Sequence, residues 1–312
     1  MKLALSNLRH AVRIGKKKLS RRLLHLRMRG QPESEILQAE RRLRGVEQYK
    51  TLRNSDVIFV SFGKSGRTWL RVMVSHLFRV KYRLPENMIL SYDNFHALNA
   101  AVPKIFFTHD NYIKDYTGDF DSKAPFYDKP VVLLVRDPRD VAVSQFFQWK
   151  HRLKPSKVAI NNYPPRESEV SLFDFVMSEG GGGMAEVVRY MNLWAREIPK
   201  VDRFLLVRYE DLRARPHEQL RRMLDFMQVD ASDEQVNAAV EYSSFDNMKK
   251  IESGAQSRFS GGRMKPRDKD NPDSFKVRRA KVGGYRDYFT DQEVAAIDAR
   301  LAETLNAMYE YV

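Results

Sequence analysis

Residues 56–70 read DVIFVSFGKSGRTWL. The apolar run 56–62 is continuous, which is typical of a β-strand buried on both faces. The turn Gly63-Lys-Ser-Gly66 follows it directly, and residues 68–79 have the pattern of a helix. A strand, a tight turn and a helix in this order predict an anion-binding site, because the first backbone N–H groups of a helix have no partner within the helix.

The same alternation of strand and helix continues to the end of the chain. Further strands are expected at 104–108, 130–135 and 203–207. Helices are expected at 138–149, at 232–242 and at 291–309, and one more follows the strand 203–207 and ends near residue 227. Strands that alternate with helices indicate a parallel sheet covered on both faces. We therefore expect one α/β domain over 51–312, P-loop-like with three layers, and a helical extension over 1–50. The glycine-, proline- and charge-rich stretch 251–276 predicts a loop.

The positive charge of the chain is concentrated in two segments. Its 312 residues include 54 Lys+Arg and 40 Asp+Glu, a formal charge of +14, and no cysteine. Residues 1–30 hold ten cations and no acid, and residues 250–281 hold ten cations and four acids. The rest is nearly neutral, so no specific nucleic-acid partner is expected. The absence of cysteine excludes disulfides, a thiol nucleophile and thiolate metal sites.

The N-terminal segment is a basic amphipathic helix. At 100° per residue, seven apolar residues share one stripe, and cations fill much of the remaining surface; they are Met1, Leu5, Leu8, Val12, Leu19, Leu23 and Leu26. Three interpretations stay open. Residues 1–30 bind an anionic membrane surface, dock the leucine stripe on the catalytic domain, or serve as an organelle-targeting segment. We expect a cytoplasmic protein, which under the membrane-binding interpretation is also peripheral to the inner face of a membrane.

The turn after the first strand is not a nucleoside-triphosphate loop of the Walker type. That pattern needs a glycine five residues before Gly63, and Ile58 stands there. The missing glycine therefore argues against a P-loop kinase, which we keep as an alternative function. A non-catalytic nucleotide-binding scaffold is a further alternative.

Residues 61–70, SFGKSGRTWL, resemble the phosphosulfate loop of sulfotransferases, the enzymes that use 3′-phosphoadenosine 5′-phosphosulfate (PAPS). Gly63 replaces a common proline and Arg67 a common threonine. Three later segments resemble the family in the same order. They are 136–144 (RDPRDVAVS), 207–212 (VRYEDL) and 278–290 (RRAKVGGYRDYFT), in which Arg279 replaces a lysine and Ala280 a glycine. The segment 242–248 (YSSFDNM) is similar to another stretch of the family.

This resemblance implies the fold, the activity and the donor-binding residues. The co-substrate is PAPS, the product is adenosine 3′,5′-bisphosphate (PAP), and no metal is required. The donor-binding residues it implies are Lys64, Ser65, Gly66, Arg67, Thr68, Trp69, Arg136, Ser144, Tyr209, Ser243, Phe245, Arg278, Arg279 and Ala280. Guanidinium groups suit phosphate because they can bind its oxygens in pairs.

His109 and Lys64 are the expected catalytic residues. His109 follows a short apolar strand, and ligands of parallel sheets bind beyond the carboxyl ends of the strands. Its ordinary pKa suits general-base catalysis near neutrality. The resemblance also implies a second lysine, but Phe107 stands at that position, and Arg67 is our candidate to compensate. The histidines at 25, 76, 96, 151 and 217 show no metal-ligand spacing.

The acceptor cannot be named from the sequence. We expect a hydroxyl or amine acceptor, whether a small molecule, a glycan or a lipid, in a pocket built from 82–102, 145–170 and 251–276. Several aromatic residues there permit an apolar acceptor without requiring one; they are Tyr92, Phe95, Phe146, Phe147 and Trp149. The oligomeric state is equally undetermined.

Overall fold

A computed structural model describes residues 2–86, 88–254, 266–268 and 270–311; for residues 2–10 it describes the backbone alone. Its helices of four residues or more are α1 (Lys2–Arg27), α2 (Glu33–Arg53), α3 (Arg67–Tyr82), α4 (Ile113–Thr117), α5 (Pro138–His151), α6 (Pro155–Ile160), α7 (Leu172–Met177), α8 (Met184–Glu197), α9 (Tyr209–Ala214), α10 (Pro216–Phe226), α11 (Asp233–Tyr242), α12 (Phe245–Ser253) and α13 (Asp291–Thr304). Short 3₁₀ turns lie at Ala124–Phe126, Ile198–Lys200, Pro272–Ser274, Gly284–Tyr288 and Ala307–Tyr309.

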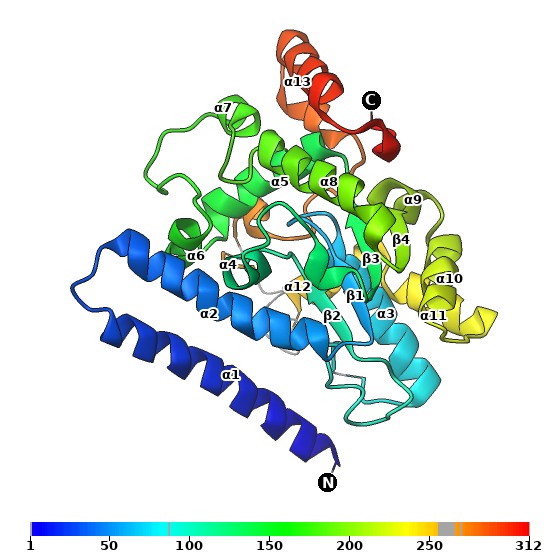
Figure 1. Ribbon diagram of the computed structural model, residues 1–312. Helices are drawn as coiled ribbons and strands as arrows, with labels where there is room; N and C mark the ends of the chain where they lie inside the picture. Colours follow the sequence, from blue (N-terminus) through cyan, green and yellow to red (C-terminus); the bar gives the residue numbers. More distant parts are fainter. Residues whose placement is uncertain (1, 87, 255–265, 269, 312) are drawn as a thin grey trace.

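The strands form one parallel sheet in the centre of the catalytic domain (Figure 1). They are β1 (Val57–Val60), β2 (Ile105–Thr108), β3 (Pro130–Val135) and β4 (Arg203–Arg208), and their order across the sheet is β2-β1-β3-β4. Val60 pairs in register with Thr108 and with Leu133. The carboxyl ends of these three strands therefore lie at one edge of the sheet, where ligands of such sheets bind.

Side chains of the sheet alternate between two hydrophobic cores. Ile58 and Val60 face one core, with helices α5 and α8. Val57 and Phe59 face the other, with helices α3, α10 and α11. Because both faces of each strand are buried, the apolar runs of the sequence are unbroken. The predicted three-layer α/β architecture is confirmed.

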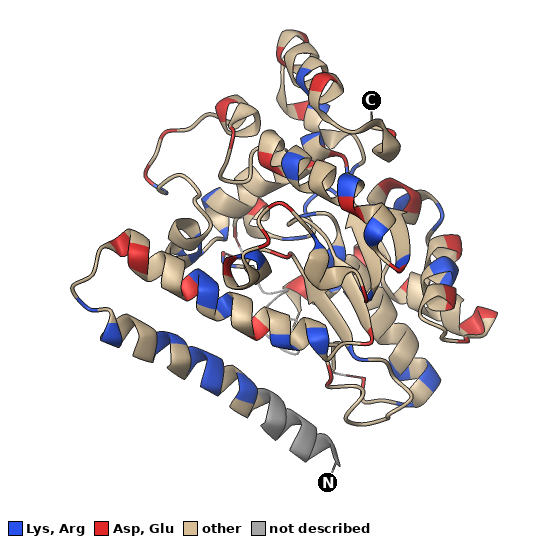
Figure 2. Ribbon diagram, in the orientation of Figure 1, with Lys and Arg blue, Asp and Glu red and all other residues tan. Residues whose placement is uncertain are grey.

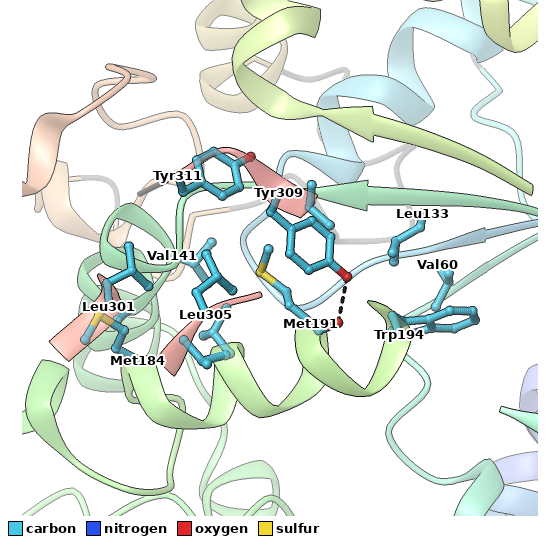
Figure 3. Packing of buried hydrophobic residues seen from close by; sticks show 14 of the residues in the cluster. Val60, Leu133, Val141, Met184, Met191, Trp194, Leu301, Leu305, Tyr309 and Tyr311 are labelled. Atoms are coloured by element: carbon cyan, nitrogen blue, oxygen red, sulfur yellow. Dashed lines mark hydrogen bonds between the residues drawn. The ribbon is translucent and has the colours of Figure 1, made fainter. Parts of the chain in front are cut away.

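The C-terminal segment closes the first core. Figure 3 shows Leu301, Leu305 and Tyr309 packed against residues of α8, and the Tyr309 hydroxyl donates a hydrogen bond of 2.6 Å to the Met191 carbonyl. The family-like segment 278–290 lies directly before helix α13, so the packing of the C-terminal residues anchors this segment beside the sheet.

The predicted elements are close to the observed ones. The strand at 130–135 matches β3, and the helix at 68–79 gains one residue at its start and three at its end. The helix expected to run to about residue 227 is divided into α9 and α10, because Pro216 cannot continue a helix. Helix α13 ends at Thr304, five residues earlier than expected. Residues 255–265 and 269 of the predicted loop 251–276 lie outside the described residues. In the described part, residues 251–253 end helix α12 and Pro272–Ser274 form a 3₁₀ turn, so the loop prediction is wrong at these positions.

Helices α1 and α2 run side by side along one flank of the domain (Figure 1). Helix α2 packs closely on α4: a Cβ added at Gly45 would lie 2.3 Å from the Tyr112 carbonyl oxygen. Helix α2 is therefore an integral part of the structure, although it precedes the first strand.

Candidate active site

A cavity of about 1260 Å³ lies at the carboxyl edge of the sheet. The turn after β1, the residues after β2, the start of α5 and segment 276–285 all contribute to its wall. All but one of the predicted site residues line it, namely Lys64, Gly66, Arg67, Thr68, Trp69, His109, Arg136, Ser144, Tyr209, Ser243, Phe245, Arg278, Arg279 and Ala280. The exception is Ser65, whose side chain is buried beside the cavity. Residues separated by up to 216 positions thus meet at one site.

The turn after β1 has a left-handed backbone at two positions. Lys64 has a φ of 71°, and Gly66, which precedes helix α3, has a φ of 92°. A Cβ added at Gly66 would lie 2.5 Å from Cδ2 of Tyr209. Glycine is therefore required at 66 for both its φ and its lack of a side chain. The turn brings the free N–H groups of α3 to the cavity, as an anion site needs.

Glycine at 63, where the family pattern commonly has proline, also has a local reason. A Cβ added there would lie 2.5 Å from Nε2 of Gln145. Gln145 is buried in α5, and its Oε1 accepts a hydrogen bond of 3.1 Å from the Tyr163 hydroxyl. This side chain occupies the space that a residue larger than glycine would fill.

Lys64 is surrounded by other cations. Burial lowers its pKa well below the ordinary value, and Lys276, Arg152 and Arg278 lower it further. Lys276 Nζ also donates to Thr68 Oγ1 at 3.2 Å. A cluster of cations with so little compensating charge favours an anionic ligand, which would restore the charged form of Lys64.

Lys276 was not among the predicted residues, and buried Glu252 holds it in place. The two Glu252 oxygens accept the backbone N–H groups of Lys276 and Val277 at 2.6 and 2.9 Å. Glu252 Oε1 is also 3.3 Å from Arg152. The only signal in the sequence was the positive charge of segment 250–281, which contains ten cations and does not single out one of them.

Arg136 lies at the end of β3 with its guanidinium over the Tyr209 ring, 4.5 Å from the ring centre. It donates to the carbonyl oxygens of Lys64 and Lys281 at 3.4 and 3.2 Å, and to Asp140 at 3.1 Å. Its buried Nε has no hydrogen-bond partner among the described residues. Ser144, two turns into α5, lines the same cavity. The predicted pairing of these residues on one side of a ligand is compatible with this arrangement.

Arg278 and Arg279 reach the cavity, but carboxylates hold both side chains. Arg278 donates to Asp273 at 2.8 Å and stacks on Phe147, 3.5 Å from the ring centre. Arg279 donates to Asp287 at 3.1 Å. Ala280 has a φ of 49°, the left-handed conformation that favours the glycine of the family pattern.

The predicted aromatic side chains form one wall. The Trp69 ring meets Tyr209 edge to face at 5.8 Å, and its Nε1 donates to the Ser243 carbonyl at 2.7 Å. The Ser243 hydroxyl donates to the Val240 carbonyl at 3.1 Å, so it acts within its own helix end. Phe245 lines the cavity at the start of α12.

The His109 ring is fixed by a backbone carbonyl. Its Nδ1 lies 2.8 Å from the Ser61 carbonyl oxygen. Since a carbonyl oxygen only accepts hydrogen bonds, Nδ1 carries the proton and Nε2 is the unprotonated nitrogen of the neutral ring. Burial lowers the pKa of His109 well below its ordinary value, and the Arg67 charge lowers it further. The ring is therefore neutral at pH 7, as a general base must be.

Two arginines lie near the position at which the family has a lysine. Arg71 is centred 4.2 Å from the Phe107 ring, and it contributes with Arg67 to the lowered pKa of His109. Both arginines line the cavity, one helical turn apart on α3. Arg71 was missed, although its spacing of four residues from Arg67 places the two on one helix face.

The predicted acceptor pocket is partly wrong. No described residue of 82–102 lines the cavity; Tyr92 instead pairs with Ile105 at the start of β2. Three of the aromatic residues expected there, Phe95, Phe146 and Trp149, are buried in cores. Segment 145–170 does contribute, and the remaining wall comes from α2, residues 106–123 and α8. The prediction failed because sequence order does not show which turns and helices pack around the cavity.

A parallel sheet with a glycine turn, buried cations and a neutral histidine at its carboxyl edge defines an α/β enzyme that acts on an anionic ligand. A profile of the sulfotransferase domain family matches residues 54–309, which includes the whole sheet and cavity apart from α2. The chain belongs to this family and is a sulfotransferase.

Curated relatives match most of the chain. It is 26% identical over 271 residues to cytosolic sulfotransferase 13 of Arabidopsis thaliana, covering 81% of this chain and 78% of the relative. It is 24% identical over 293 residues to sulfotransferase 6B1 of Mus musculus, covering 90% and 86%.

Solved structures share the fold. Mouse sulfotransferase SULT7A1, complexed with PAP, superposes with a TM-score of 0.52 at 19% identity and covers 83% of this chain and 89% of its own. Retinol dehydratase, in a complex with retinol and PAP, has a TM-score of 0.55 at 17% identity and covers 84% and 85%.

Proposed function

We propose that the enzyme transfers the sulfuryl group of PAPS to an acceptor hydroxyl, with His109 as general base. The single observation that carries this proposal is one cavity that joins the cationic turn at Lys64 to the neutral His109 ring. The left-handed turn at Gly66 and the buried Nε of Arg136, which has no partner in the described ranges, fit a bound phosphate. The structural neighbours complexed with PAP have the same fold.

Each residue of the site has a separate role in the proposed reaction. His109 Nε2 takes the acceptor proton while the acceptor oxygen forms a bond to sulfur and the bond from sulfur to the donor phosphate oxygen breaks. Lys64 and the N–H groups at the start of α3 stabilise the charge that develops on the departing phosphate. The 3′-phosphate is held by Arg136, Ser144, Arg278 and Arg279. To reach it, the last two release the carboxylates of Asp273 and Asp287 that they bind in the free enzyme. The adenine is surrounded by Trp69, Tyr209 and Phe245.

Donor binding tests this function before any acceptor is known. In calorimetric titrations we expect PAP to bind and ATP with Mg²⁺ to bind far more weakly. Arg136→Ala should weaken PAP binding about tenfold or more, because a charged hydrogen bond is worth about 1.5–3 kcal/mol.

The matched control is Arg203→Ala, an arginine at the opposite end of a strand whose guanidinium contacts Phe226 and not the cavity. It should leave PAP affinity unchanged. Preference for ATP with Mg²⁺ would instead favour a kinase, and an Arg136 variant with wild-type affinity would remove that residue from the phosphate site.

We further propose that α1 binds an anionic membrane surface and that the enzyme is cytoplasmic and peripheral to the membrane. Helix α1 contacts its neighbours through charged side chains. Arg21 donates to Glu47 at 2.6 Å, Lys17 lies 3.6 Å from Glu47, and Arg13 donates to Asp93 at 2.8 Å. The predicted alternative, in which the leucine stripe docks on the catalytic domain, is therefore wrong for the described side chains.

The leucine stripe faces outward. Leu19, Leu23 and Leu26 are 56%, 43% and 66% exposed, and they lie roughly opposite the paired cations on the helix. The cations that flank the stripe form no ion pair with the described residues; they are Lys16, Lys18, Arg22, Arg27 and Arg29. Figure 2 shows basic residues along the described part of α1 and no acidic residue. A second copy of α1 would be repelled, whereas an anionic lipid surface complements both the leucines and the charges.

Vesicle binding checks this proposal. The full-length protein should co-sediment with vesicles of phosphatidylcholine and phosphatidylglycerol more than with phosphatidylcholine alone. Replacing Lys16, Lys18 and Arg22 by Gln should weaken binding on the order of 100-fold, since each cation contributes about 1 kcal/mol. Equal replacement of exposed Arg42, Lys50 and Lys250 is the control. If the two triple variants bind alike, or the wild type ignores the anionic lipid, α1 does not act on membranes.

No helix among the described residues is long and apolar enough to cross a membrane.

A further inference from the structure

Part of the cavity wall comes from elements that carry no donor-loop residue. Helices α2, α4, α6 and α8 contribute this part, and polar side chains predominate in it. Its charged and amide members include Arg41, Gln48, Lys114, Lys157, Asn161 and Glu186. A wall of this kind suits a polar acceptor better than an apolar one, because an apolar ligand would leave these groups without water or partners.

Cations outnumber carboxylates where α1, α2, α4 and α6 meet. The carboxylates are already engaged: Glu40 pairs with Arg44, and Asp115 pairs with Arg41 at 2.8 Å. Glu47 pairs with both Arg21 and Lys17. Each acid in this cluster therefore has a cation, and at least one further cation, Lys157, lines the cavity beside them.

Lys157 has no carboxylate partner among the described residues. Its Nζ donates to the Tyr112 hydroxyl at 3.2 Å, and that hydroxyl donates to Asn161 Oδ1 at 2.7 Å. Nζ also lies 5.3 Å from the centre of the Tyr112 ring. Burial, together with the charges of Arg44 and Arg21, lowers the pKa of Lys157 to about 8. A buried cation of this kind is held at a cost that an anionic ligand would remove.

Arg41 and Gln48 complete this corner on the side of α2. Arg41 is fixed by Asp115 and by the Ile160 carbonyl, to which it donates at 2.7 Å, and it is centred 5.7 Å from the Tyr112 ring. Gln48 lines the cavity, and its buried Oε1 accepts no hydrogen bond from the part of the chain that the structure describes. An acceptor hydroxyl could donate to this oxygen.

We infer that the acceptor carries an anionic group, a carboxylate, sulfate or phosphate, besides the hydroxyl that reacts. In this anionic subsite Lys157 and Arg41 bind the charge, and Gln48 accepts from a hydroxyl. The inference rests on the proposed sulfuryl transfer and specifies its acceptor. It also gives α2 a role in substrate binding, although the helix lies outside the region matched by the family profile.

Matched acceptor pairs test the inference with radiolabelled PAPS. The pairs are methyl glucuronide and methyl glucoside, para-hydroxyphenylacetate and its amide, and glycerol phosphate and glycerol. Within at least one pair, the anionic member should have a kcat/KM at least tenfold higher than its neutral partner. The three pairs also distinguish a sugar, a phenol and a phosphate as the source of the anion.

Lys157→Met should remove that preference by raising KM for the anionic acceptor, with little change in kcat or in PAP affinity. Lys154→Met is the control, because Lys154 is an exposed lysine just before the same helix and does not line the cavity. In the wild type the preference should decline as pH rises through about 8, where Lys157 loses its charge. The Lys157 variant should lack this decline.

The possible results separate the two levels of inference. Equal or better use of the neutral members, or a preference that survives Lys157→Met, overturns the anionic subsite. Turnover of no anionic member by an enzyme that binds PAP also overturns it and leaves the donor site in place. Failure to bind PAP at all would instead overturn the proposed function.

Discussion

His109→Ala should reduce sulfuryl transfer by about 10²–10⁴-fold and leave PAP affinity unchanged, because a positioned general base contributes a factor of this size. The change removes the nitrogen that takes the acceptor proton, while the cationic turn around Lys64 stays intact. Single-turnover kinetics with bound PAPS measure the chemical step directly, and a titration with PAP measures the donor site.

The chain offers a closely matched control in His96. Its Nδ1 lies 2.8 Å from the Val102 carbonyl, the same kind of contact that His109 makes with Ser61, but it does not line the cavity. His96→Ala should therefore lose a similar hydrogen bond without losing activity. Near-normal turnover by His109→Ala would exclude His109 as the base, and loss of PAP binding would indicate a structural role.

The pH profile gives a second readout of His109. Protonation at Nε2 abolishes base catalysis, so the rate should fall as pH decreases through the pKa of His109. Because burial and Arg67 lower that pKa, the decrease should occur below the ordinary value of 6.5. Exchange of Arg67 for methionine should shift the decrease toward higher pH.

Lys64→Met should lower turnover by about 10²–10³-fold, the usual loss when one group that stabilises developing charge is removed. Unlike the His109 variant, it should also weaken donor binding, since Lys64 attracts the donor in the ground state as well. Lys50→Met, which removes an exposed lysine of α2, should have neither effect. Turnover and PAP affinity are measured on the same preparations.

Proton uptake on PAP binding tests whether the charge of Lys64, and not only the size of its side chain, acts on the donor. In the free enzyme burial and nearby cations lower the pKa of Lys64, and the bound anion should raise it again. PAP binding at a pH above the lowered pKa should therefore take up a proton, measured as a dependence of the binding enthalpy on the buffer. The Met variant should lose this uptake; an unchanged proton count would show that Lys64 does not respond to the donor.

The sheet and the donor turn could be predicted because their signals are local. A strand buried on both faces has an unbroken apolar run, and the helix after Gly66 has its own periodicity. The positions of Lys64, Gly66 and His109 follow from these patterns, since Lys64 and His109 come after strands and Gly66 directly precedes helix α3. The break before Pro216 is also encoded locally, in the proline itself, and the prediction of one continuous helix missed it.

The network that holds the site together could not be read from local patterns. Lys276 reaches Thr68 across 208 residues of sequence, and its position depends on buried Glu252. The cationic neighbours of His109 likewise depend on how α3 packs over Phe107. Such contacts are between side chains distant in sequence, and composition alone indicated only that cations were abundant nearby.

By itself, the sequence determined that a parallel α/β sheet carries an anion-binding turn and a histidine at one edge, because strand burial, turn chemistry and helix periodicity are encoded within short stretches. Only the tertiary structure decided which face of α1 is exposed and that α2 borders the cavity. Those outcomes depend on which helix packs beside which: Lys157 lies beside Tyr112 because α6 and α4 meet, and the leucines of α1 face outward because its other side pairs with acids.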